Sequence, residues 1–186
     1  MRFLKKGDIF YDIGAQAGYH SILAARCVGQ TGRVFAFEAL ERNQRYMVRN
    51  FALNRLTNAE VVCAAVSDAS GRGNFEPNPG FMAGHLSDSG SLIVNCITLD
   101  SWVESGHPPP TFLKIDAEGS ELRVLHGAKM TLEHNLPVVF LDTHDFLGGA
   151  CKGIHRECLE FLRRSGYNIV KSSRSSRFAD RISAWP

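Results

Sequence analysis

The chain has 186 residues, a formal net charge of +2 and 44% hydrophobic residues, which predicts one globular domain over residues 1–186. The near-neutral charge argues against a nucleic-acid partner, and no apolar run approaches the roughly 18 residues of a membrane-spanning helix, so no membrane partner is expected. Five scattered cysteines without a C-x-x-C pair argue against a disulfide framework or a structural zinc site and favour a cytoplasmic protein.

The most informative stretch is a short apolar run, Ile9–Ile13, that ends in a glycine-rich turn. An amphipathic segment over residues 19–28 follows at once, so the pattern predicts a strand, a tight turn and a helix. Gly14 and Gly18 are spaced G-x-x-x-G, which differs from the G-x-G-x-x-G turn of dinucleotide-binding sites. Asp12 suits a ligand with an ammonium or a hydroxyl group, because an acid would repel a pyrophosphate. An ordinary turn with two incidental glycines is the alternative.

The rest of the chain alternates between strands and helices. Strands are expected at residues 33–38, 59–66, 111–115 and 136–141, and helices at residues 41–54, 120–135 with a break near Gly127, and 154–165. Two short strands are expected between residues 167 and 186. Residues 70–96 are polar and too long for a plain connector, so a hairpin or loop insertion is expected there. The alternation predicts an α/β fold with a parallel, doubly wound sheet.

Polar side chains recur at the carboxyl ends of these predicted strands. They are Asp12, Glu38, Ser67, Asp68, Asp116 and His144. Ligands of open α/β sheets bind along this edge, so we expect these side chains to surround one site. Glu38 follows the glycine turn by about 20 residues, where an acid commonly accepts hydrogen bonds from a ribose. The alternative for Glu38 is an interaction with the dipole of the next helix. Ser67 and Asp68 can contact the amine of an adenine or can form a simple turn.

Several stretches together resemble one known family. They are DIGAQAGYHS at 12–21, VFAFE at 34–38, AVSD at 65–68, ITLD at 97–100, LKIDAEGSE at 113–121 and LDTH at 141–144. In combination they resemble the FkbM-type methyltransferase family over roughly residues 7–166. The resemblance implies a class I S-adenosylmethionine-dependent methyltransferase that acts on a hydroxyl of a sugar or secondary metabolite. It also implies a Rossmann-like, mostly parallel sheet of seven strands, with helices on both faces and an antiparallel last strand.

The resemblance assigns the cofactor to one set of residues at the carboxyl edge. They are Asp12, Gly14, Gly18, Tyr19, Glu38, Ser67, Asp68 and Asp116. Asp116 is expected near the methionine end of the cofactor and the transferred methyl group. An alcohol is a poor nucleophile while protonated, so a nearby base is expected. His144 is the first candidate for this base and Asp116 the second, although a histidine at a strand end is also often structural.

Two further interpretations concern the surroundings of Asp116. Together with Glu118 and Glu121 it can be read as a divalent-cation site, but an acid-rich helix N-terminus is preferred and no metal site is predicted. The acceptor is expected to be a small molecule or a glycan, bound near the 70–96 insertion. Candidate acceptor contacts are Tyr19, His20, Phe81, Met82 and His85.

Other functions fit the sequence less well. The glycine spacing disfavours a nicotinamide-dependent oxidoreductase. The near-neutral charge and the lack of an Asn/Asp-Pro-Pro-aromatic run after the fourth strand disfavour a nucleic-acid methyltransferase. A catalytically degenerate, methyltransferase-like binding module is the principal alternative to an O-methyltransferase.

Overall fold

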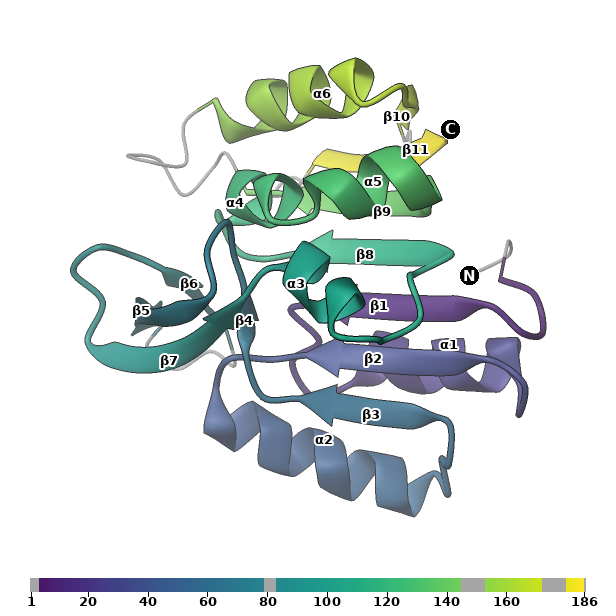
Figure 1. The fold of residues 1–186 in the computed structure, drawn as a ribbon. Helices are drawn as coiled ribbons and strands as arrows, with labels where there is room; N and C mark the ends of the chain where they lie inside the picture. Colours follow the sequence, from purple (N-terminus) through teal and green to yellow (C-terminus); the bar gives the residue numbers. More distant parts are fainter. Residues whose placement is uncertain (1–3, 79–82, 145–152, 172–179, 186) are drawn as a thin grey trace.

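The computed structural model describes residues 4–78, 83–144, 153–171 and 180–185. Its main sheet contains β1 (Ile9–Ile13), β2 (Arg33–Phe37), β3 (Ala59–Val62), β8 (Phe112–Asp116), β9 (Val138–Thr143), β10 (Asn168–Lys171) and β11 (Asp180–Trp185). The strand order is β10-β11-β9-β8-β1-β2-β3 (Figure 1). β1, β2, β3, β8 and β9 run parallel, whereas β11 runs antiparallel to β9 and β10. This confirms the predicted Rossmann-like methyltransferase architecture with an antiparallel last strand.

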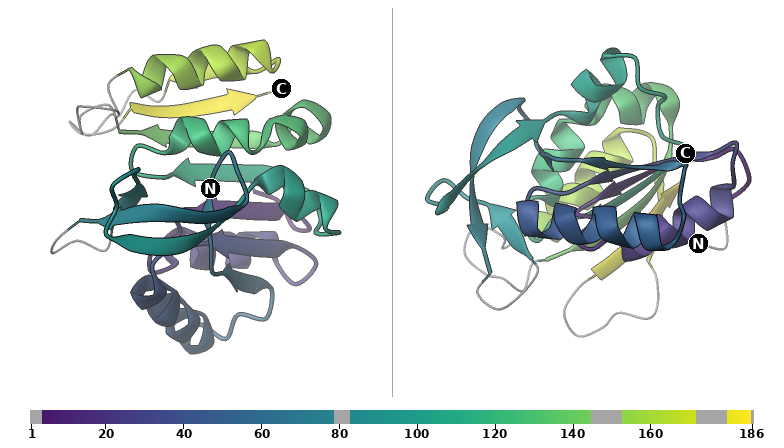
Figure 2. Two further views of the ribbon diagram at one scale, coloured as in Figure 1. Left: turned by 60° about the vertical axis from the view of Figure 1, so that its left-hand side comes forward. Right: turned by 90° about the horizontal axis from the view of Figure 1, so that it is seen from below.

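Helices cover both faces of this sheet, as Figure 2 shows. The helices are α1 (Tyr19–Val28), α2 (Glu41–Leu53), α3 (Leu99–Glu104), α4 (Glu121–His126), α5 (Lys129–Asn135) and α6 (Ile154–Arg164). Alternate side chains of β1 pack on opposite faces of the sheet, because successive side chains of a strand point in opposite directions. Tyr11 and Ile13 pack with residues of α3 to α6, and Phe10 packs with α1. Among the described residues, no helix is long and apolar enough to span a bilayer.

The register of the parallel strands brings their carboxyl ends level. Ile13 pairs with Phe37 of β2 and with Ile115 of β8, and Asp116 pairs with Asp142 of β9. Polar residues at these ends therefore meet at one edge. The expected helix break near Gly127 is confirmed, because α4 ends at residue 126 and α5 starts at residue 129.

Two predicted strands are wrong in their bounds. The segment expected as one strand over 59–66 divides, because the Ala64 N–H turns back to donate to the Val62 carbonyl at 2.9 Å. Residues after this break form β4 (Ala65–Val66) in a different sheet. The strand expected at 136–141 runs instead from 138 to 143, because Leu136 has a left-handed φ of 47° and Pro137 has no N–H for the ladder.

The expected 70–96 insertion forms most of a second sheet. This sheet consists of β4, β5 (Gly71–Pro77), β6 (Gly84–Leu86) and β7 (Leu92–Ile97), in the order β4-β7-β5-β6. β5 pairs antiparallel with β6 and β7, and Phe75, Val94 and Cys96 pack on Leu40. The small sheet lies beside the carboxyl ends of the main sheet (Figure 1). It therefore supplies part of the wall of the site described next.

Candidate active site

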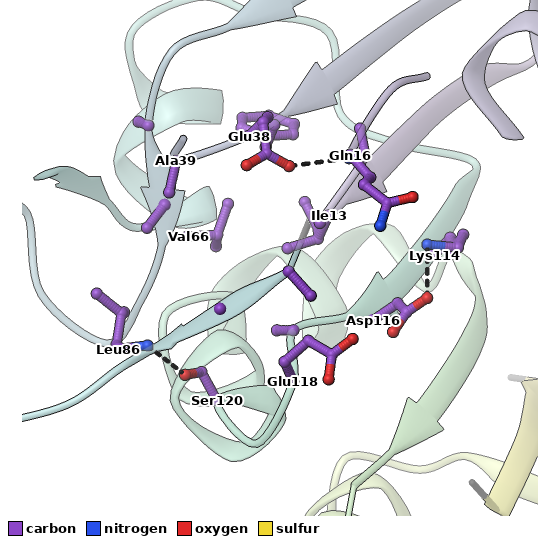
Figure 3. A pocket seen from close by; sticks show the side chains of 18 of the residues that line it. Ile13, Gln16, Glu38, Ala39, Val66, Leu86, Lys114, Asp116, Glu118 and Ser120 are labelled. Atoms are coloured by element: carbon purple, nitrogen blue, oxygen red, sulfur yellow. Dashed lines mark hydrogen bonds and ion pairs between the residues drawn. The ribbon is translucent and has the colours of Figure 1, made fainter. Parts of the chain in front are cut away.

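A cavity of about 340 Å³ opens at the carboxyl ends of β1, β2 and β8. Residues of the glycine turn, Glu38, β4, the small sheet and the loop after β8 line it. Figure 3 shows Glu38 at one end of the cavity and Lys114 and Asp116 at another, with Ile13 between them, while Val66 and Leu86 form the wall on the side away from Lys114 and Asp116. The cavity thus joins a polar end, an apolar wall and an acidic end.

The glycine turn lets the chain approach β8 closely. Gly14 has a φ of +73°, and a Cβ at this position would collide with the backbone carbonyl of Asp116. Gly18 has a φ of +84°, and a Cβ there would come within 2.8 Å of Met47. Both positions therefore need glycine for conformation and for space. Tyr19, the first residue of α1, lines the cavity and is largely exposed.

Glu38 presents a buried carboxylate at the first end of the cavity. Its Oε2 accepts the Gln16 N–H at 2.8 Å, and its Oε1 accepts the Leu40 N–H at 2.8 Å and Asn43 Nδ2 at 3.2 Å. Burial raises the pKa of Glu38, and these hydrogen bonds oppose the increase. The side chain is therefore held in place at the cavity wall, where its oxygens can accept further hydrogen bonds from a diol.

The structure does not bring Ser67 and Asp68 into this cavity. They line a second hollow of about 190 Å³ between the small sheet and α4, where Ser67 Oγ donates to Asp68 Oδ1 at 2.9 Å. The residues just before them, Ala64, Ala65 and Val66, line the main cavity instead. The contact of Ser67 and Asp68 with an adenine stays a prediction.

A mostly buried lysine contacts two of the predicted site residues. Lys114 Nζ lies 3.2 Å from Asp12 Oδ1 and 3.4 Å from Asp116 Oδ2. Asp12 is fully buried and also accepts a hydrogen bond from Ser21 Oγ at 2.6 Å. Burial lowers the pKa of Lys114, but the two carboxylates outweigh it and the net pKa is raised. Lys114 is therefore charged and holds Asp12 and Asp116 in fixed positions.

His144 lies among three carboxylates. Its Nδ1 is 2.7 Å from Glu121 Oε1, and its Nε2 is 3.5 Å from Asp116 Oδ1 and 3.7 Å from Glu118 Oε2. Burial lowers the pKa of His144, but the hydrogen bond to Glu121 and the three negative charges raise it to about 8. The structure thus brings together the two predicted catalytic residues, His144 and Asp116. His144 is 6% exposed and contacts the cavity wall through Asp116 and Glu118.

The family model of the methyltransferase FkbM domain matches residues 12–169, and this match identifies the family. The chain belongs to the FkbM methyltransferase family. A curated relative is the hexuronic acid methyltransferase AglP of Haloferax volcanii, which is 31% identical over 145 residues. That match covers 75% of this chain and 57% of the relative.

Solved structures share the fold of this chain. One is a methyltransferase FkbM from Methylobacillus flagellatus, with a TM-score of 0.67, 19% identity and coverage of 100% of this chain and 45% of that chain. Another is Aeropyrum pernix fibrillarin in complex with S-adenosyl-L-methionine, with a TM-score of 0.62, 13% identity and coverage of 97% and 67%. The chain therefore spans about half the length of AglP and of the Methylobacillus protein.

The contacts of two residues at this site, Lys114 and Glu121, were not predicted from the sequence. Lys114 could have been recognised as a charged residue in the middle of a mostly apolar strand. The sequence predicts Glu121 only as a cation ligand or a helix N-terminal acid, whereas it is fully buried and forms a hydrogen bond with His144. Within the described residues, Asp116, Glu118 and His144 each offer one atom that could bind a metal ion, and these atoms lie within 4.8 Å of one another.

The proposed acceptor contacts have mixed outcomes. Tyr19 and His20 line the cavity, and their rings meet edge to face with centroids 5.3 Å apart. His85 lies on β6 and does not line the main cavity. Phe81 and Met82 lie outside the described residues.

Proposed function

We propose that this chain transfers a methyl group from S-adenosylmethionine to a hydroxyl oxygen of a sugar, with hexuronic acid glycosides as the first acceptors to test. The observation that carries the proposal is the cavity itself. It connects the carboxylate of Glu38 with the Asp116–His144 cluster at the carboxyl edge of a methyltransferase-type sheet. AglP, a relative named for methylation of hexuronic acid, supports the choice of acceptor.

The residues present fit the proposed cofactor. Glu38 offers a fixed carboxylate for the ribose hydroxyls, and Gly14 and Gly18 leave space for a close approach. Val66 and Leu86 provide an apolar wall for the adenine. The far end carries several carboxyl groups around one lysine and one histidine, and this excess of negative charge suits a sulfonium and an ammonium group.

When bound, S-adenosylmethionine would supply an electrophilic methyl group that an oxygen nucleophile can attack in line, with the sulfur leaving as a thioether. The chain contributes alignment of the acceptor and removal of its proton. His144 takes the proton at Nε2, and Asp116 is the second candidate for this task. Lys114 holds Asp116 in place, because its ammonium group lies 3.4 Å from Asp116 Oδ2.

A thermal-shift titration tests the cofactor assignment. S-adenosylmethionine at a hundredfold excess over its dissociation constant adds about 2.7 kcal/mol to stability. For a protein of this size, that corresponds to a rise in Tm of roughly 5–10 °C. NADH is expected to give no shift.

The variant Glu38→Ala is expected to weaken cofactor binding at least tenfold, because it removes the carboxylate that meets the ribose. Glu41→Ala is the matched control, since Glu41 lies three residues on and its side chain is 74% exposed. Equal binding by wild type and Glu38→Ala would contradict the assignment. A wild-type chain that binds the cofactor but methylates no sugar would instead support the degenerate binding module.

A further inference from the structure

We propose that Glu121 is a positioning residue for His144, because it fixes the hydrogen of the imidazole on Nδ1 and directs the basic Nε2 toward Asp116 and Glu118. The catalytic consequence of this proposal rests on the function proposed above. Its structural content, the tautomer and protonation of His144, can be measured without any acceptor. The two can therefore fail separately.

The geometry around Glu121 carries the proposal. Glu121 is the first residue of α4 and is fully buried. Its Oε1 accepts the Gly119 N–H at 3.0 Å and bonds His144 Nδ1 at 2.7 Å. One carboxylate oxygen thus binds the loop after β8 and the residue after β9. Because the same loop carries Glu118 and directly follows Asp116, Glu121 holds both halves of the cluster together.

The chemistry of the two partners determines the tautomer. A neutral imidazole has one N–H donor and one acceptor nitrogen, and an ionised carboxylate can only accept. A hydrogen bond between His144 and ionised Glu121 therefore requires the hydrogen on Nδ1. The lone pair then resides on Nε2, which lies 3.5 Å from Asp116 Oδ1 and 3.7 Å from Glu118 Oε2. The carboxylate–histidine pair of hydrolytic triads fixes its base in the same way.

Charged groups on three elements face the ring and set its basicity. Asp116 is on β8, Glu118 is in the following loop and Glu121 is on α4, while Lys114 neutralises part of the charge of Asp116. Burial lowers the pKa of His144, but these carboxylates together raise it to about 8. Glu121 contributes both the hydrogen bond and the nearest charge. Without Glu121, the effect of burial is less fully offset, and the pKa of His144 is lower.

In the proposed reaction, the proton of the acceptor hydroxyl moves to His144 as the methyl group is transferred. The acceptor oxygen forms a bond to the methyl carbon, and its proton moves to Nε2 of His144. The electron pair of the broken carbon–sulfur bond stays on sulfur, which becomes a thioether. The positive charge that appears on the ring of His144 is stabilised by the adjacent carboxylate of Glu121, 2.7 Å away.

The test compares the full chain with its Glu121→Gln variant, which keeps the size of the side chain and removes its charge. Nitrogen-15 NMR of the imidazole, assigned with His144→Gln, reports the pKa and the tautomer. The wild type should titrate near pH 8 and carry hydrogen on Nδ1 above that pH. In Glu121→Gln the pKa should fall by at least one unit and the second tautomer should appear. Glu133→Gln, an exposed acid on α5, should match the wild type.

Kinetics supply the second measurement. The pH at which kcat reaches half its plateau should fall in Glu121→Gln by the same amount as the pKa. The plateau should drop by about 10²–10⁴-fold, the usual contribution of a positioned base. Glu121→Asp, which keeps the charge, should restore part of the rate, and the cofactor Kd should stay within threefold.

Three results separate the possibilities. An unchanged pKa and tautomer in Glu121→Gln would overturn the proposal, whatever the activity. A changed tautomer with an unchanged rate and pH profile would overturn the positioning role. If the wild type shows the expected pKa and tautomer but transfers no methyl group to any acceptor, the proposed function fails and the structural content of this inference stands.

Discussion

Lys114→Met is expected to destabilise the fold strongly, because it leaves the buried carboxylate of Asp12 without its ion-pair partner. Asp12 is fully buried, and Lys114 Nζ lies 3.2 Å from its Oδ1. Removing one partner of a buried ion pair costs about 3–5 kcal/mol. The second contact, to Asp116, adds less than about 1 kcal/mol because that side chain is 29% exposed and partly screened by solvent. We therefore expect the free energy of unfolding to fall by about 3–5 kcal/mol at pH 7.

Guanidinium denaturation followed by circular dichroism measures this loss, since the free energy of unfolding is linear in denaturant concentration. The matched control is the double variant Lys114→Met/Asp12→Asn. Asn at position 12 carries no charge and can still accept the hydrogen bond from Ser21. We expect it to recover more than half of the lost stability. A loss of stability below about 1 kcal/mol, or no recovery in the double variant, would show that an unpaired Asp12 carboxylate is not the cause of the destabilisation.

Two further predictions concern stability. The pKa of His144 is raised from 6.5 to about 8, so its contribution of about 2 kcal/mol is complete below pH 6.5, declines between pH 6.5 and 8 and is absent above that range. Thermal melts from pH 6 to 9 should show this decline in wild type and not in His144→Gln; parallel curves would contradict it. Gly14→Ala should lower Tm and abolish cofactor binding, because its Cβ collides with the Asp116 carbonyl. Gly106→Ala has a similar positive φ but open space around it, so calorimetric titration should show it binding the cofactor normally.

Local patterns were sufficient to predict the main sheet. β1 and α1 have the bounds expected from an apolar run, two glycines and an amphipathic segment. The second sheet was harder to predict from the sequence, because β4 joins it only through pairing with the distant β7. β6 is only three residues long and shows no alternation that a sequence could reveal.

The candidate site was predictable where it depends on strand ends. Asp116 ends β8 and His144 follows the neighbouring parallel strand β9, so their proximity follows from topology alone. Ser67 and Asp68 lie elsewhere because the chain turns after β3, and the sequence shows no strong turn signal there. The contacts of Lys114 and Glu121 depend on side-chain direction and burial, which residue spacing does not determine.

Methyl transfer to a defined sugar tests the central claim most directly. The chain is incubated with methyl-labelled S-adenosylmethionine and a glucuronic acid glycoside, and the product is treated with mild alkali. Our account predicts that label enters the sugar, that it resists alkali as a methyl ether does, and that His144→Gln reduces its incorporation at least a hundredfold at pH 8.5. Label lost in alkali would mean that the carboxyl group is methylated instead of a hydroxyl. No transfer to any sugar by a chain that binds the cofactor would contradict the proposed activity.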